Sequence, residues 1–302
     1  MALQSGGLAA AARGFALPFM LLPLLSACAK VPLQQTGSLS SYERLQPAGG
    51  MRTKASVSVD KEQVLAARTV RIIPTSLSAG AAAATLSERD RRLVANAVDR
   101  AVCIGLSDRF HVVMPPQKAD LTVHVTIATI VPTGPKAAAA TVALDIGKTV
   151  LTNTGVVETS FPIPSVRVPI GLGGIALEGE AVDAAGRQRA AMLWARGASA
   201  FFGNTTRISP VGDAYELSAD FGDDFSEMLV KGEDPFRTKL PSIPTMQRVK
   251  SMLGGAPKEA ACDAFGRKGV KDMLAGKLGL PPGWTDKGAQ ADRQVQASAL
   301  SR

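Results

Sequence analysis

Cys28 has the setting of a residue that is modified during export. It directly follows Leu25-Ser26-Ala27, which closes an apolar run that begins at Phe15, and one positive charge, Arg13, precedes that run. A basic start, an apolar core and small residues before a cut are typical of a secretory signal. The thiol of a cysteine at the cut is a nucleophile that an enzyme can alkylate. The sequence therefore predicts covalent chemistry at Cys28.

The four residues Leu25-Ser-Ala-Cys28 resemble the lipobox of bacterial lipoproteins. The resemblance implies that the signal peptide 1–27 is removed, that Cys28 carries a diacylglyceryl thioether, and that the new amine is acylated, with palmitate for example. Two or three acyl chains anchor a protein stably where one holds it weakly. Ala29 next to the lipobox favours outer-membrane over inner-membrane delivery. The alternative is an ordinary signal peptide followed by an unrelated cysteine.

The apolar run of the signal does not predict a permanent membrane span. It has about half of the roughly 20 residues that a transmembrane helix needs. Pro18 and Pro23 also interrupt it. We therefore expect a protein of the cell envelope that faces the periplasm and is held by its acyl chains.

Two cysteines, Cys103 and Cys262, remain once Cys28 is assigned to lipid. An exported chain meets oxidising surroundings, where two free thiols are candidates for a disulfide. Two interpretations stay open: a Cys103–Cys262 bridge, or two unrelated and partly buried thiols. We expect Cys103 on the flank of a helix, near Arg100 and Ser107, where it is accessible.

Glu178 and Glu180 are the best candidates for catalysis. They are two residues apart on a predicted strand, so both side chains point to one face. Paired carboxylates can perform acid–base chemistry or glycoside hydrolysis. Arg187 and Arg189 lie on the neighbouring predicted arm, however, and can pair with the glutamates across the ladder. We favour this structural role and keep an envelope hydrolase as the alternative.

Other chemical motifs are weak. His111 and His124 are two histidines on predicted strands, whereas a zinc site normally has three or four ligands. Gly171-Leu-Gly-Gly174 does not open a helix after a strand, and the Gly-x-Ser-x-Gly pattern is absent. We therefore predict no catalytic residue, no metal ligand and no cofactor.

Hydrophobic periodicity predicts an α/β fold of the α+β kind, with a mixed, largely antiparallel sheet and two main helices on one face. The predicted helices cover 86–108, capped by Thr85 or Ser87, and 213–231. The predicted strands cover 69–74, 110–114 and 121–131, and a hairpin covers 175–196 with its turn at 184–186. Residues 137–151 are a further candidate helix, and 152–174 is rich in loop-forming residues.

The predicted organisation has four parts. The signal peptide is 1–27, a lipidated flexible tether is 28–60, the folded domain is 61–234, and a C-terminal extension, 235–302, has short helices and a disordered tail. A random-coil tether of this length lets the domain sit about 30 Å from the membrane.

The charge pattern bears on partners. The formal charge of +8 falls to +7 when Arg13 is removed with the signal. Charges of both signs alternate along the chain, so no block resembles a nucleic-acid-binding arm. We expect no nucleic acid partner. The expected partners are the membrane, through the acyl chains on Cys28, and an envelope protein or lipid.

Five further stretches are similar to the bacterial lipoproteins catalogued as domain of unknown function 3313, and the resemblance spans about residues 37–230. They are Gly37-Ser-Leu-Ser-Ser-Tyr-Glu-Arg-Leu-Gln-Pro47, Val70-Arg-Ile-Ile-Pro74, the Phe-x-Val-Val strand at 110–113, the Ala-Asp-Leu-Thr-Val-His-Val-Thr-Ile strand at 119–127, and Leu177-Glu-Gly-Glu-Ala-Val-Asp-Ala-Ala-Gly186. The resemblance implies a lipid-anchored domain and brings no known activity. Together with the lack of a catalytic constellation, it favours a non-catalytic binding or accessory protein.

Overall fold

The computed structural model describes residues 29–81, 86–134, 171–199, 208–237, 249–251 and 253–286. Cys28 and the signal peptide lie outside these residues. So do the candidate helix 137–151, most of the 152–174 segment, and the end of the chain from 287, where we expected a disordered tail.

An eight-stranded sheet forms the centre of the fold. Its order is β1-β2-β8-β7-β6-β3-β5, with β4 beside β6. The pairs β3–β6, β3–β5 and β4–β6 are parallel, and the other pairs are antiparallel. The strands are β1 (Gln46–Gly49), β2 (Thr53–Val59), β3 (Thr69–Ile72), β4 (Ser76–Leu77), β5 (His111–Val112), β6 (Leu121–Val131), β7 (Gly174–Asp183) and β8 (Gln188–Gly197). The predicted fold class is confirmed.

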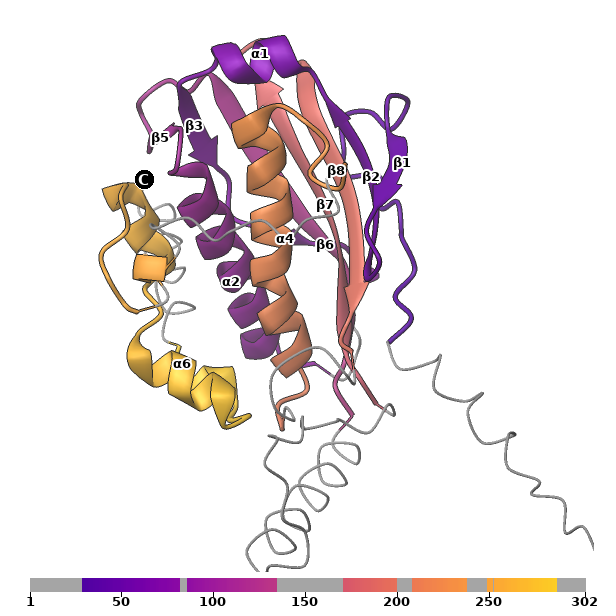
Figure 1. Ribbon diagram of the computed structural model, residues 1–302, viewed down its shortest axis with the longest axis vertical. Helices are drawn as coiled ribbons and strands as arrows, with labels where there is room; N and C mark the ends of the chain where they lie inside the picture. Colours follow the sequence, from indigo (N-terminus) through magenta and orange to yellow (C-terminus); the bar gives the residue numbers. More distant parts are fainter. Residues whose placement is uncertain are drawn as a thin grey trace, which may run out of the picture.

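Two long helices, α2 (Glu88–Leu106) and α4 (Gly212–Lys231), lie side by side on one face of this sheet (Figure 1). Short α1 (Lys61–Ala66) lies across the upper end of the sheet. Ser87 begins α2 as its N-cap by accepting a hydrogen bond from the Asp90 amide. Gly232, with φ of 65°, ends α4 in the left-handed conformation that glycine adopts most easily.

Glycine brings the helices and the sheet into close contact. A Cβ on Gly222 of α4 would lie 2.5 Å from the Cβ of Ala101 in α2. A Cβ on Gly179 of β7 would lie 2.8 Å from a ring carbon of Phe225 in α4. Side chains alternate along a strand, and Gly179 is on the side of the helices. Its neighbours Glu178 and Glu180 therefore face the other side of the sheet. That other side of the sheet is called the outer face below.

The segment that we expected to be a flexible tether is part of the folded domain. Residues 46–59 contain β1 and β2, and β2 pairs with β8 along its whole length. Residues 29–45 lie against the outer face, where Val31 packs on Ala176 and Ala195. Figure 1 shows this segment on the side of the sheet away from α2 and α4. The prediction of a free tether of about 30 Å is therefore wrong for the described residues.

The C-terminal extension packs along α2. It contains η2 (Ala260–Phe265), α6 (Val270–Lys277) and η3 (Pro282–Trp284). A disulfide joins Cys103 of α2 to Cys262 of η2. The structure therefore has the bridge rather than two separate thiols. Cys103 is fully buried instead of accessible, because η2 covers the flank of α2 on which it lies.

A buried ion pair holds the extension at a second point. Arg100 of α2 donates to Asp286 with an Nη2–Oδ2 distance of 2.6 Å, and both side chains are almost completely inaccessible. The hydroxyl of Tyr215 in α4 donates to the same Asp286 oxygen and accepts from Arg100. Burial raises the pKa of Tyr215 well above its ordinary value. Asp286 is thus held to both long helices.

Removing the disulfide should destabilise the domain. Replacing Cys103 and Cys262 together by alanine is expected to lower the free energy of unfolding by about 2–4 kcal/mol, because the cross-link restricts the unfolded chain. Denaturant titration measures this loss. The native protein in the presence of reductant should show the same decrease in the free energy of unfolding. If the intact mass does not rise by two hydrogen atoms on reduction, the bridge is absent.

Asp224 should make stability depend on pH. Trp194 Nε1 donates to its Oδ2 at 2.8 Å, and burial raises the Asp224 pKa from 3.8 to about 6. The folded state therefore binds the Asp224 proton more tightly than the unfolded state does. The stability that this protonation contributes is complete below about pH 4 and is lost as the pH rises through about 6.

The variant Asp224→Asn carries no charge and can still accept from Trp194. It should be more stable than the native protein by about 1–2 kcal/mol at pH 7, less than the full shift implies because solvent reaches part of the carboxylate. The difference should vanish near pH 4. Unfolding curves at both pH values measure it, and a variant less stable at pH 7 would contradict the assignment.

Candidate functional site

Glu178 and Glu180 lie on the outer face of the sheet, as their spacing predicted. They are only 1% and 5% exposed, which is unusual for carboxylates. Across the ladders, Glu178 is opposite Thr126 of β6 and Leu193 of β8. The cover that buries the two glutamates is the N-terminal segment, residues 29–45.

Glu178 accepts hydrogen bonds from three residues of this segment. The Thr36 amide donates to Oε1 at 2.6 Å, and the Thr36 hydroxyl donates to Oε2 at 2.8 Å. The amide and hydroxyl of Ser38 and the hydroxyl of Tyr42 also donate to Oε2. The Tyr42 oxygen in turn accepts from the amides of Gly37 and Leu39, so the segment turns tightly around the carboxylate.

Glu180 is bound in the same way one step further along β7. The Ser40 amide donates to Oε2 at 2.8 Å, and the Ser40 hydroxyl donates to Oε1 at 2.9 Å. The side-chain amide of Gln188 in β8 donates to Oε2 and also to the carbonyl of Ser41. Both carboxylates are therefore held by neutral donors, most of them from residues 36–42.

These contacts explain why a polar segment docks on a sheet. A buried carboxylate without hydrogen bonds is costly, whereas charge-assisted hydrogen bonds to it are short and strong. Apolar contacts close the rim, because Leu39 packs with Leu193 and Ala191, beside Tyr42 and Leu45. The serines and threonine that suggested a flexible tether are thus the hydrogen-bond donors of a buried site.

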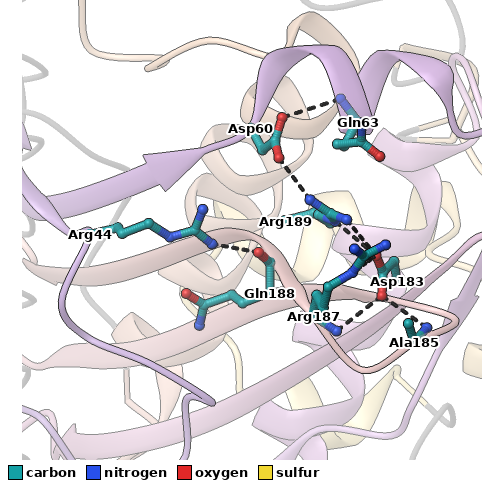
Figure 2. Close-up of polar contacts among 8 residues, drawn as sticks. All are labelled: Arg44, Asp60, Gln63, Asp183, Ala185, Arg187, Gln188 and Arg189. Carbon is teal, nitrogen blue, oxygen red and sulfur yellow. Dashed lines mark hydrogen bonds and ion pairs between the residues drawn. The ribbon is translucent and has the colours of Figure 1, made fainter.

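The expected pairing of the glutamates with Arg187 and Arg189 is wrong. In the β7–β8 ladder Glu178 is opposite Leu193 and Glu180 is opposite Ala191, so the arginines lie beyond the glutamates, near the turn of the hairpin. Both arginines bind Asp183 instead, and Arg189 also binds Asp60, which precedes α1 (Figure 2).

Figure 2 shows this network at the turn that joins β7 and β8. The carboxylate of Asp183 accepts from the amides of Ala185 and Arg187 in the turn, and the Arg187 amide is the main cause that holds the Asp183 pKa well below its usual range. The Arg44 guanidinium donates to the carbonyl of Gln188 at 2.5 Å. The predicted turn is confirmed, since Gly186 has φ of 75°.

The arrangement does not resemble a catalytic centre. Each glutamate oxygen already accepts at least one hydrogen bond, and residues 36–42 cover the side from which a substrate would approach. The Nδ1 atom of His111 in β5 lies 2.6 Å from Oε2 of Glu259, and His124 of β6 is exposed and lies across the ladder from Glu180 of β7. In the part of the chain that the structure describes, no three side chains form a group able to hold a metal ion.

Sequence reasoning missed the residues that bind the glutamates. Thr36, Ser38 and Ser40 repeat at a spacing of two, which matches the spacing of Glu178 and Glu180. That match was the available signal, and it was hidden because residues 28–60 have the composition of a linker. Two of the stretches that suggested the family resemblance, 37–47 and 177–186, are thus in direct contact.

Removing the Glu178 carboxylate should release the N-terminal segment. Glu178→Ala leaves the donors of Thr36, Ser38 and Tyr42 without their acceptor, and is expected to lower the free energy of unfolding by roughly 2–4 kcal/mol. Glu43→Ala is the matched control, since Glu43 is exposed on the same segment and should change stability by less than about 0.5 kcal/mol. Equal denaturant midpoints for the two variants would contradict this role.

Comparison with known proteins agrees with the motif resemblance. No curated protein matches the chain. Among solved structures, the PelC dodecamer from Paraburkholderia phytofirmans is similar with a TM-score of 0.34 and 6% identity, over 60% of this chain and 99% of that one. A variant of that PelC in another crystal form has a TM-score of 0.29 and 10% identity, over 57% and 95%. The model of the family described as "Protein of unknown function (DUF3313)" matches residues 34–225, and the chain belongs to this family.

Proposed function

We propose that this chain is an exported lipoprotein of the bacterial cell envelope that acts as a non-catalytic binding or accessory protein. Its acyl chains on Cys28 hold it on a membrane, with the domain facing the periplasm. Ala29 favours the outer membrane. The expected partners are an envelope protein or a lipid, and neither nucleic acid nor a cofactor has a role.

The docking of the N-terminal segment is the observation that carries this proposal. It uses the carboxylates of Glu178 and Glu180, the strongest candidates for catalysis, to fix the chain next to Cys28. The Ala29 amide donates to the Ala198 carbonyl at 3.0 Å, so the residue after the proposed lipid anchor is part of the fold. A protein built this way couples its membrane attachment rigidly to its domain.

Export is supported by the disulfide. Bridges such as Cys103–Cys262 persist in oxidising compartments such as the periplasm and are rare in the cytosol. Among the described residues, no helix is long and apolar enough to cross a membrane. Acylation of Cys28 is the attachment that the sequence motif offers.

The hydrolase alternative has no observation in its favour. Its two carboxylates are buried, and all four of their oxygens accept hydrogen bonds from residues 36–42 or from Gln188. Since the N-terminal segment occupies the outer face of the sheet, a partner would bind another surface of the domain. The edge strand β1 is one of them, with Gln46 and Pro47 exposed.

The anchor is tested by Cys28→Ala. This variant should lose the acyl mass and should leave the membrane fraction or keep its signal peptide, because the thiol that receives the lipid is gone. Cell fractionation and intact mass spectrometry of the chain measure both effects.

The matched control is the Cys103→Ala/Cys262→Ala protein, which keeps Cys28 and should stay acylated and membrane-bound. Density-gradient separation of the two membranes then checks the outer-membrane assignment. If Cys28→Ala is processed and fractionates like the native protein, the lipoprotein proposal is wrong.

A further inference from the structure

One end of the domain holds the residue that follows the proposed anchor. Ala29 bonds to Ala198 just after β8, and Ala198 bonds in turn to Gly173 just before β7. The Gly173 amide donates to Asp213 in the first turn of α4. This end, where β6 and β8 end and β7 and α4 begin, is called the anchor end below. In Figure 1 it is the lower end of the sheet.

Large apolar side chains are exposed at the anchor end on separate elements. Met51 is 99% exposed in the turn before β2, whose first residue, Thr53, pairs with Arg196 at the end of β8. Ile208, which precedes α4, is 52% exposed, and its amide donates to the carbonyl of Gly279 just after α6. That hydrogen bond brings the end of α6 to the start of α4.

Helix α6 adds an apolar stripe. Val270, Leu274 and Leu278 are spaced by four residues, so they share one face, and they are 47%, 51% and 70% exposed. Trp284 in η3 is 70% exposed, and the neighbouring Gly283 carbonyl accepts from Arg89 in the first turn of α2. Figure 1 shows α6 at the same end of the molecule as the first turns of α2 and α4.

The opposite end of the domain differs. There the exposed large apolar residues are Leu65 of α1 and Met114 after β5, at 39% and 42%. Exposed lysines occur at both ends, with Lys30, Lys54 and Lys271 at the anchor end and Lys61 and Lys231 at the opposite end, so the exposed apolar side chains are what distinguishes the anchor end. Exposed apolar side chains together with lysines are the composition of a surface that binds the headgroup region of an anionic bilayer.

We infer that the anchor end docks on the membrane, with Leu274, Leu278 and Trp284 inserted among the lipid headgroups. The inference rests on the proposed acylation of Cys28, which would hold this end at the bilayer because no free tether follows the cysteine. Tryptophan is enriched at such interfaces, where its ring is half in lipid and half in water. The occupant of this surface is therefore the phospholipid bilayer that carries the acyl chains.

Tryptophan fluorescence tests the docking directly. The chain has two tryptophans, and Trp194 is completely buried. The processed, acylated protein is reconstituted into vesicles of phosphatidylethanolamine and phosphatidylglycerol with brominated chains, which quench fluorescence on contact. Most of the Trp284 emission should be lost. A Trp284→Phe protein should show no quenching, because it reports Trp194 alone.

Substitutions distinguish insertion from general proximity. Leu274→Gln together with Leu278→Gln should restore most of the Trp284 emission, whereas Leu65→Gln at the opposite end should leave the quenching unchanged. Flotation of the same vesicles tests the anchor separately. Protein that floats with unquenched Trp284 would overturn the docking and leave the anchor standing. Protein that does not float would overturn both.

Discussion

Two glutamates, Glu178 and Glu180, project from the middle of a sheet strand and are buried on the face away from the helices. Gly179 between them is in close contact with Phe225 of α4. Because side chains alternate along a strand, this contact places both glutamates on the opposite face. A carboxylate in that position needs hydrogen-bond donors, and the N-terminal segment supplies them. The folded position of the segment, and with it the position of the residue after Cys28, depends on this requirement.

The two faces of the sheet are therefore covered through different interactions, apolar packing on one and hydrogen bonding on the other. Apolar side chains of α2 and α4 cover the inner face, where Phe221, Phe225 and Leu229 are fully buried. Polar backbone and hydroxyl groups cover much of the outer face. The Cys103–Cys262 bridge and the Arg100–Asp286 pair then fix the C-terminal extension outside α2. The N-terminal segment is thus attached to the outer face of the sheet, and the C-terminal extension is attached to the helices on the other face.

Local patterns in the sequence predicted both long helices and the strands β3, β5, β6, β7 and β8, and missed β1, β2, β4 and α1. The alternation in Leu121–Val131 gave the bounds of β6 correctly, and the second long helix begins one residue before its predicted start at 213. What failed depended on distant contacts. Residues 36–42 bind glutamates about 140 positions away, and Cys103 is covered by the extension, so these environments depend on contacts that local patterns do not show. The sharing of one face by the two glutamates was predictable, whereas the signal for their donors was a matching spacing of two inside a segment with the composition of a linker.

Hydrogen–deuterium exchange of the mature chain tests the central claim most directly. The amides of Thr36, Ser38 and Ser40 donate to buried carboxylates, so they should exchange far more slowly than in an unstructured peptide. Their protection should approach that of the core strands β7 and β8. Exchange of these three amides at the rate of a free peptide, in a protein whose core strands are protected, would contradict the docked segment and the account built on it.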